Sequence, residues 1–411
     1  MRNPLFGAAI LSAVAAATAS AGDWPQILGP ARDGVAVDES LADRWPAAGP
    51  AKVWSRPVGA GYAGVAGTAE RLVLFHRVDD REVVEALDPA TGAAVWRQEH
   101  PTSFAPQVGG NSGPLCVPLI AGGRVVTYGA QGVLSCDDLV TGARLWQRRT
   151  HREFDAQEGY FGAGSSPILV GDTVVVNVGG KRGESGVVGF ALDDGATRWS
   201  VTQEPASYAA PTRVDFDGVP HVLMVTRYAA LLLDPATGTV RWRFPFGQRG
   251  PTVNAATPLV FADGHLLVTA SYGIGSVYAA FDAATVTPVW EGADALASQY
   301  CTPIAFGDHV YAIDGRDDGP PGTLTCLVRG TGAVAWAERG FGYGTLVAAD
   351  GKLIAVKTGG EAVLLEPDPA GPRILAKARL LRGTIRALPA LVDGRLIVRD
   401  DTTLAAFDLR K

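Results

Sequence analysis

The sequence predicts an all-β protein, an eight-bladed β-propeller built from four-stranded antiparallel blades. The main observation is a short segment, ALDPATGAAVW at residues 86–96, because similar copies of it recur and end in tryptophan. The terminal tryptophans lie 43 to 53 residues apart, a period that fits one four-stranded blade. The composition favours many short turns over long helices, since 51 of the 411 residues are glycine and 27 are proline.

Each copy of the segment is typical of a strand, a turn and a second strand. In the first copy an apolar strand ends at Asp88, residues 89–92 form the turn, and the next strand begins near Val95. Two further strand signals precede each copy, as at residues 258–260 and 265–269, with an Asp-Gly pair between them. Every repeat therefore contains four strands.

The two ends of the chain each carry part of a blade. Residues 51–56 resemble an outermost strand, with Trp54 in the usual place, but no inner strands precede them. The last strand, residues 404–409, stops where a turn and an outermost strand would follow. We expect the two termini to complete one blade, because an incomplete sheet would expose open edges. The expected blades are residues 61–97, 107–147, 163–200, 206–243, 254–291, 299–337, 342–379, and 383–409 with 51–56. Because the seventh lacks a tryptophan, a seven-bladed ring is the alternative.

The first 21 residues resemble a signal peptide. They contain a positive start, an apolar segment and an Ala-Ser-Ala sequence, so we expect cleavage near Ala21-Gly22 and export to the periplasm or another extracytoplasmic space. No cysteine follows the apolar segment, so no lipid anchor is expected. Residues 22–50 have no repeat and should form an N-terminal arm on the outside of the body, with Trp24 and Trp45 packed down. Residues 51–411 should form a single propeller domain.

The charge and hydropathy of the chain exclude two classes of partner. A formal net charge of −6 and a pI near 5.6 leave no basic surface for nucleic acid. After the first 22 residues no apolar stretch is long enough to span a bilayer, so we expect no transmembrane span. We expect a monomer.

The repeated motif resembles that of a known family. The spacing A-x-D-x-x-T-G-x-x-x-W, seen at Ala86, Asp88, Thr91, Gly92 and Trp96, is similar to the tryptophan-docking repeat of pyrroloquinoline quinone (PQQ) propellers. That superfamily includes quinoprotein alcohol dehydrogenases and the BamB-like subunit of the outer-membrane β-barrel assembly machinery. The resemblance implies that the tryptophan of one blade packs against the turn of its neighbour. The docking residues are then Trp54, Trp96, Trp146, Trp199, Trp242, Trp290 and Trp336, with Gly92, Gly142, Gly238 and Gly332.

The resemblance does not extend to the cofactor site of the dehydrogenases. Those enzymes hold the quinone with two adjacent cysteines, a stacked tryptophan, a calcium or lanthanide ion and a catalytic aspartate. Here Cys116, Cys136, Cys301 and Cys326 are not adjacent, and the chain is much shorter. All four replace small buried residues of the repeat, so we expect packed thiols rather than disulfides. We predict no bound PQQ, no metal site and no catalytic residue.

A set of polar and aromatic residues falls at one level of the repeat, three positions before the innermost-strand proline or its replacement. This level should surround one mouth of the central channel, where ligands commonly bind. The candidate binding residues are Tyr62, Tyr208, Tyr300, Tyr343 and Arg386, with Asn111, Asn254 and Gln299 close to the same level. Packing of the tyrosines at a crowded mouth is the alternative. The loops at residues 151–164 and 247–254 should cover the same face.

Other chemical patterns are weak. The six histidines form no metal-ligand spacing, and no paired acid and base indicates a hydrolase or lyase. The acidic loop at residues 314–318 is more typical of a solvated turn than of a metal site. The sequence therefore favours a non-catalytic scaffold of the cell envelope, which binds an envelope protein or peptide segment, including outer-membrane assembly components, or a small ligand. The alternative is a quinoprotein-like oxidoreductase with a PQQ-type cofactor.

Overall fold

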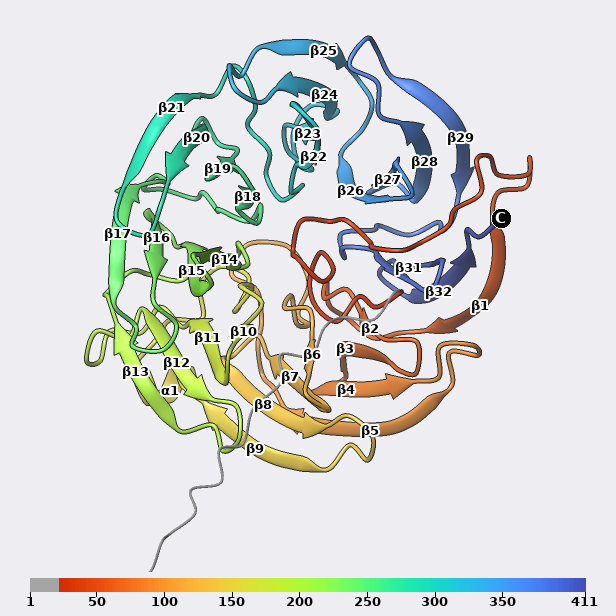
Figure 1. Ribbon diagram of the computed structural model, residues 1–411. Coiled ribbons are helices and arrows are strands. Elements are labelled where there is room, and N and C mark those ends of the chain that lie inside the picture. The colour runs from red at the N-terminus through yellow and green to blue at the C-terminus, as the bar shows by residue number, and fades with distance from the viewer. Residues whose placement is uncertain (1–21) are drawn as a thin grey trace, which may run out of the picture.

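The computed structural model describes residues 22–411, so the expected signal peptide lies outside the described residues. The described chain forms eight four-stranded antiparallel sheets, arranged as blades around a central axis (Figure 1). The all-β class and the count of eight blades are confirmed, and the seven-bladed alternative is wrong. Within residues 22–411 the single α-helix is α1 (Thr150–Phe154), which follows the outermost strand of blade 2.

Each blade has an innermost strand beside the axis, followed outward by three more strands. The innermost strands of blades 1 to 8 are β2 (Ala66–Gly67), β6 (Leu119–Ala121), β10 (Ile168–Val170), β14 (Thr212–Phe216), β18 (Leu259–Phe261), β22 (Ile304–Phe306), β26 (Gly344–Ala349) and β30 (Ala390–Val392). The second strands are β3 (Leu72–Val78), β7 (Arg124–Tyr128), β11 (Thr173–Asn177), β15 (Val219–Val225), β19 (His265–Ala270), β23 (His309–Asp314), β27 (Lys352–Lys357) and β31 (Arg395–Arg399). The third strands are β4 (Arg81–Leu87), β8 (Val133–Asp138), β12 (Val187–Ala191), β16 (Ala229–Leu233), β20 (Gly275–Phe281), β24 (Thr323–Val328), β28 (Glu361–Glu366) and β32 (Thr403–Asp408). The outermost strands are β5 (Ala94–Pro101), β9 (Arg144–Arg149), β13 (Thr197–Val201), β17 (Val240–Pro245), β21 (Val286–Gly292), β25 (Val334–Glu338), β29 (Arg373–Arg379) and β1 (Ala51–Pro57).

The ring is closed by strands from both ends of the chain. β1 pairs antiparallel with β32, with Trp54 opposite Ala406, which confirms the expected shared blade. A buried guanidinium reinforces this closure. Arg399 of β31 donates hydrogen bonds to the carbonyl oxygens of Ala63 (3.2 Å) and Gly59 (2.8 Å), which precede the innermost strand of blade 1. Strand pairing therefore completes the last blade with a segment that leads directly into the first, and the side chain of Arg399 bonds the two blades together.

Seven of the eight outermost strands carry a tryptophan that packs on the next blade. Each indole N–H donates a hydrogen bond of 2.8 to 2.9 Å to a main-chain carbonyl of the neighbouring turn. The pairs are Trp54 with Pro89, Trp96 with Leu139, Trp146 with Leu192, Trp199 with Pro235, Trp242 with Asp282, Trp290 with Arg329, and Trp336 with Asp368. Turn glycines make room for the ring. These glycines are Gly92, Gly142, Gly238 and Gly332. A Cβ at any of these positions would lie only 2.5 to 2.9 Å from an indole atom, and the φ angles of all four are positive.

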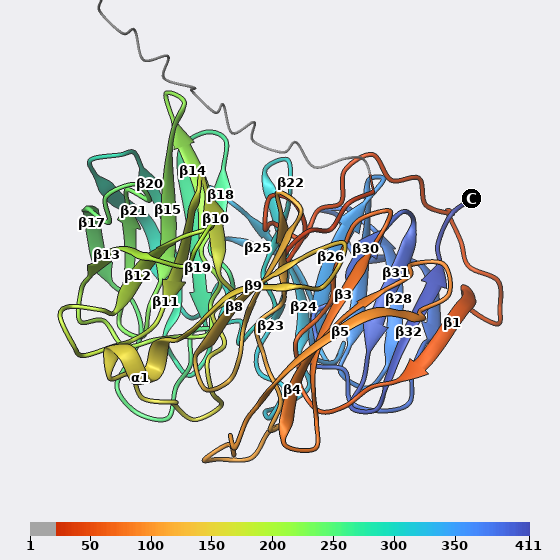
Figure 2. The same ribbon diagram turned by 90° about the horizontal axis from the view of Figure 1, so that it is seen from below.

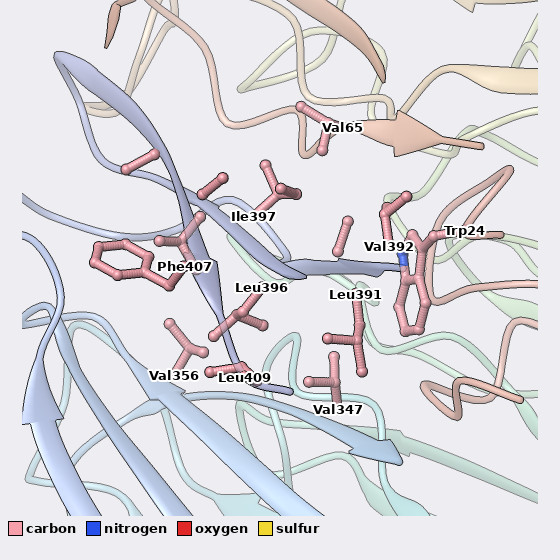
Figure 3. Close-up of a cluster of buried hydrophobic side chains, with 14 of the residues drawn as sticks. Trp24, Val65, Val347, Val356, Leu391, Val392, Leu396, Ile397, Phe407 and Leu409 are labelled. Atoms are coloured by element: carbon pink, nitrogen blue, oxygen red, sulfur yellow. The ribbon is translucent and has the colours of Figure 1, made fainter. Parts of the chain in front are cut away.

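The seam between blades 7 and 8 has no docking tryptophan. On β29, Ala376 stands at the register position that Trp96 has on β5. The N-terminal arm contributes apolar side chains to the core at this part of the ring. Trp24 is buried in the same cluster as Val392 of β30 (Figure 3), and the half-buried Trp45 packs against that cluster. The arm therefore adds to the core where the repeat is weakest.

The sequence suggested that the arm, residues 22–50, lies on the outside of the body. The structure shows that it also reaches the central axis. It runs along one face of the ring and across its centre (Figures 1 and 2). Trp24 forms a β-bridge with Gly67 of β2, and Val35 forms one with Ala348 of β26. The expected outside location was wrong for a physical reason. Each innermost strand has no strand partner on the side of the axis, so its main-chain groups need other partners, and the arm supplies some of them.

Candidate functional site

The two ends of the central axis are built differently. We call the end where the innermost strands finish the arm face, and the end where they begin the mouth face. On the arm face, Pro25 accepts a hydrogen bond from the main-chain N–H of Ile120 in β6, and Ala36 donates one to Ala348 in β26. The arm thus bonds to innermost strands on different sides of the ring, and the mouth face is the end that the arm leaves uncovered.

Arg32 fixes the arm at the axis. Its guanidinium is fully buried and donates to the carbonyl oxygens of Ser166 (3.3 Å), Pro167 and Pro211 (2.9 Å), which lead into blades 3 and 4. Its Nε donates to the side chain of Gln26 at 2.9 Å. Burial lowers the pKa of Arg32 to about 9. These bonds occupy the guanidinium with the protein's own carbonyls, so Arg32 is a structural clamp.

On the mouth face, Arg386 joins two blades. Its Nε lies 2.6 Å from a carboxylate oxygen of Asp317, in the loop between β23 and β24 of blade 6. Its Nη1 donates to the hydroxyl of Tyr62 at 3.4 Å, and the guanidinium lies 5.5 Å from the centre of the Tyr62 ring. Burial opposes the charge of Arg386, but Asp317 and Tyr62 outweigh it and raise its pKa. Arg386 is therefore a charged group that remains about one third exposed.

Gln299 extends this network. Its side-chain oxygen accepts the main-chain N–H of Asp317 at 2.9 Å, and its amide nitrogen donates to the hydroxyl of Tyr272 at 2.7 Å. Tyr272 in turn lies under the guanidinium of Arg316, 4.9 Å from the ring centre. The loop of blade 6 is thereby fixed against blade 5.

Tyr300 and Tyr343 pack edge to face, with ring centres 4.8 Å apart. The hydroxyl of Tyr343 accepts the main-chain N–H groups of Tyr300 (2.8 Å) and Cys301 (3.2 Å), so this tyrosine is committed to packing. The hydroxyl of Tyr300 is buried and has no hydrogen-bond partner among the described residues. Burial first, and then the charge of Asp317, raise the pKa of Tyr300 well above its usual value. Tyr300 therefore carries a neutral, buried hydroxyl whose hydrogen-bonding capacity is unused among the described residues.

Three other predicted residues serve the fold. The hydroxyl of Tyr208 accepts the main-chain N–H of Phe161 at 3.2 Å, within the loop at residues 151–164. The side chain of Asn254 is buried and donates to main-chain carbonyls, including that of Thr226 at 2.9 Å. Asn111 accepts the main-chain N–H of Gly113 in its own turn. These contacts favour the packing alternative for this side of the mouth face.

The predicted set thus separates into two groups. We call Tyr62, Gln299, Tyr300, Asp317 and Arg386 the mouth cluster, because charge contacts or hydrogen bonds relate them across blades 6, 8 and 1. Sequence reasoning missed Asp317, which it treated as part of a solvated turn, although this side chain is only 11% exposed. The one available signal was the unusual length of the loop in DGRDDGPPG, which is enough to reach a neighbouring blade.

Comparison with known proteins identifies the family. A family model described as outer membrane protein assembly factor BamB matches residues 80–338, more than half of the chain. The chain belongs to this family. No curated protein sequence matches it. In residues 22–411 no helix is both long and apolar enough to cross a membrane.

Solved structures of the BamB family and of quinoproteins share the fold. The structure of BamB from Moraxella catarrhalis is 18% identical, with a TM-score of 0.64, and the match covers 87% of this chain and 99% of that one. A quinohemoprotein alcohol dehydrogenase from Comamonas testosteroni is 14% identical, with a TM-score of 0.65 and coverage of 96% and 82%. A europium-containing methanol dehydrogenase is 12% identical, with a TM-score of 0.67 and coverage of 92% and 89%. At these identities the likeness concerns the fold alone.

The mouth face of this BamB-family protein does not fit the cofactor site of the dehydrogenases. The carboxylate of the mouth cluster, that of Asp317, is paired with Arg386, and both ends of the Gln299 amide are bonded. Within residues 22–411 no group of three or more acidic, histidine or cysteine side chains could hold a metal ion. The four cysteines are buried free thiols, as predicted, and Cys301 beneath Tyr300 has no cysteine neighbour in sequence. The residues present offer neither a metal cage nor a disulfide platform for a quinone.

Proposed function

We propose that this protein is a non-catalytic binding scaffold of the cell envelope, which holds a segment of another envelope protein at the mouth cluster. One observation carries the proposal: the arm occupies one end of the axis, while the other end presents the partly exposed side chains of Tyr62 and Arg386, which bond to each other across blades 8 and 1. Tyrosine and arginine at the centre of a surface are the usual anchors of protein recognition.

The electrostatics of the mouth cluster favour binding over acid–base catalysis. Asp317 forms an ion pair with Arg386, 2.6 Å from its Nε, so its carboxylate is already engaged by a cation of the protein. Tyr300 keeps its proton because burial disfavours the phenolate. Tyr300 is therefore not suited to exchange a proton near neutral pH, whereas the partly exposed Tyr62 and Arg386 can form hydrogen bonds with a bound segment.

The family description supports a location in the envelope and a partner among outer-membrane assembly components. We propose that the first 21 residues direct export and that the mature protein acts as a monomer. A chain segment of a partner is a better match to the mouth cluster than a small cofactor, since the cluster spans three blades.

Affinity capture from the native envelope tests this proposal. The double variant Tyr62→Ala, Arg386→Ala should lose the partners that wild-type protein retains. A matched double variant, Tyr228→Ala with Arg243→Ala, removes an exposed tyrosine and an exposed arginine outside the cluster and should retain them. Equal capture by both folded variants would refute binding at the mouth cluster.

Titration with PQQ and calcium separates the scaffold from the quinoprotein alternative. We expect no saturable binding and no alcohol-dependent dye reduction, because the mouth lacks a cage for the metal. Stoichiometric binding with turnover would replace the scaffold proposal with the oxidoreductase.

A further inference from the structure

The arm face contains a cavity that the proposed function does not use. It has a volume of about 310 Å³ and lies between the arm, β14 of blade 4, and β18 of blade 5. This is within the size range of small-ligand sites. Its apolar lining includes side chains from both blades, with Phe216, Leu259, Phe261 and Phe281 among them. We call this cavity the arm pocket.

One carboxylate, that of Asp33, lines the arm pocket from the arm side. It accepts the main-chain N–H of Val35 at 3.0 Å. No lysine, arginine or histidine of the described chain lies within ion-pair distance of it. Burial raises the pKa of Asp33, so its ionised form has lost favourable hydration without gaining a cation.

The neighbouring charges are already neutralised or bonded. Arg213 and Asp215 pair with each other at 2.7 Å, and Arg329 pairs with Asp263 at 2.6 Å beside Phe261. Arg32 also lines the pocket, but its guanidinium is occupied by main-chain carbonyls and Gln26. Arg32 brings a positive charge to the same lining, but its donors are directed to those acceptors, so among the charged groups of the pocket Asp33 is the one left to take a new ion-pair partner.

We infer that the arm pocket binds a small primary ammonium ion with an apolar or aromatic body, for which Asp33 is the counter-ion. The ammonium group would satisfy the carboxylate, and the body would fill the space between Phe216 and Phe281, whose rings already pack edge to face at 5.3 Å. The Phe261 ring adds a surface on which a cation or an apolar group is favoured. The pocket lies at the opposite end of the axis from the mouth cluster, so this inference does not depend on the proposed function.

Calorimetric titration with phenethylamine tests the inference, with phenethyl alcohol as the neutral analogue of matched shape. The mature wild-type protein should bind the amine at least about tenfold more tightly than the alcohol, since a charge-assisted bond to the carboxylate is lost in the alcohol. Asp33→Asn should remove this preference. Asp38→Asn, the same change at an exposed arm residue outside the pocket, should leave it intact.

Two results would overturn the inference. One is equal affinity of the wild-type protein for the amine and the alcohol, a comparison that needs no variant and holds even if Asp33→Asn fails to fold. The other is an unchanged preference in folded Asp33→Asn. Weakened binding of the amine in Phe281→Leu would support the arm pocket as its location, whereas unchanged binding there would contradict it.

Discussion

The two ends of the central axis contain similar residue types but use them differently. On the arm face, Arg32 is buried and donates to three main-chain carbonyls of its own chain. On the mouth face, Arg386 pairs with one carboxylate and remains about one third exposed. An arginine near a propeller axis is therefore not by itself a binding residue. What decides its role is whether the protein already satisfies its donors.

Removal of residues 22–56 should have the largest effect. This deletion removes both the arm and β1, so the last blade loses its outermost strand and the inner strands lose their partners on the arm face. We expect a sharp fall in the melting temperature. Placing residues 51–56 after residue 411 of the shortened chain, through a short linker, should restore part of the stability by completing the blade. An unchanged melting curve for the deletion would contradict ring closure.

The substitution Trp146→Ala tests the contacts between neighbouring blades, which lie away from both ends of the axis. It should lower the free energy of unfolding by about 3 to 5 kcal/mol, because it empties a buried aromatic site and removes one of the two donors to the carbonyl of Leu192, the other being Arg124. Denaturant unfolding measures the change. Trp45→Ala, at a half-buried arm residue, is the control and should cost less. A loss below about 1 kcal/mol at Trp146 would show that the docking contact contributes little.

Replacing Arg32 and Arg386 separately by alanine compares the contribution of each arginine to stability. Arg32→Ala should lower the free energy of unfolding by about 2 to 4 kcal/mol, since several buried carbonyls lose their donor. Arg386→Ala should cost less than about 1 kcal/mol, because its ion pair is partly exposed. Equal losses measured by denaturant unfolding would mean that Arg386 is also a structural clamp.

Acid should destabilise the ring through a buried histidine at the seam of blades 8 and 1. Burial first, and then Arg399 and Arg56, lower the pKa of His76 from 6.5 to about 3. The unfolded chain therefore binds a proton that the folded chain excludes, so stability falls as the pH drops from 6.5 towards 3. His76→Asn should reduce this loss by about 1 to 2 kcal/mol at pH 4. His309→Asn, at a half-buried position on β23, is the control. An identical pH profile in all three proteins would exclude this mechanism.

The repeat predicted the fold because it is local. The spacing from Asp88 to Trp96 fixes a turn and a strand, and the eight blades close as a ring when the strand of Trp54 completes the last one. The arm could not be placed from sequence in the same way. Its position depends on Arg32 reaching carbonyls more than 130 residues away in the chain, and no local pattern encodes that distance.

The mouth residues were only partly predictable for a related reason. Alignment of the repeats places Tyr62, Tyr300 and Tyr343 at one level, but it does not say which hydroxyl is bonded. Tyr343 is tied to the main chain of the preceding blade, whereas Tyr300 is not bonded among the described residues. Asp317 comes from a loop outside the repeat, so the alignment could not include it.

Site-specific photo-crosslinking at the two ends of the axis tests the central claim most directly. A photoreactive amino acid would replace Tyr62 at the mouth cluster in one protein and the exposed Val37 of the arm in another, and crosslinks would be identified in the native envelope. We predict that the protein with the photoreactive group at position 62 forms a crosslink to a specific partner, and that Arg386→Ala abolishes this crosslink. The protein with the group at position 37 should form no such crosslink. A partner captured only from position 37, or one from position 62 that is unaffected by Arg386→Ala, would contradict the central claim.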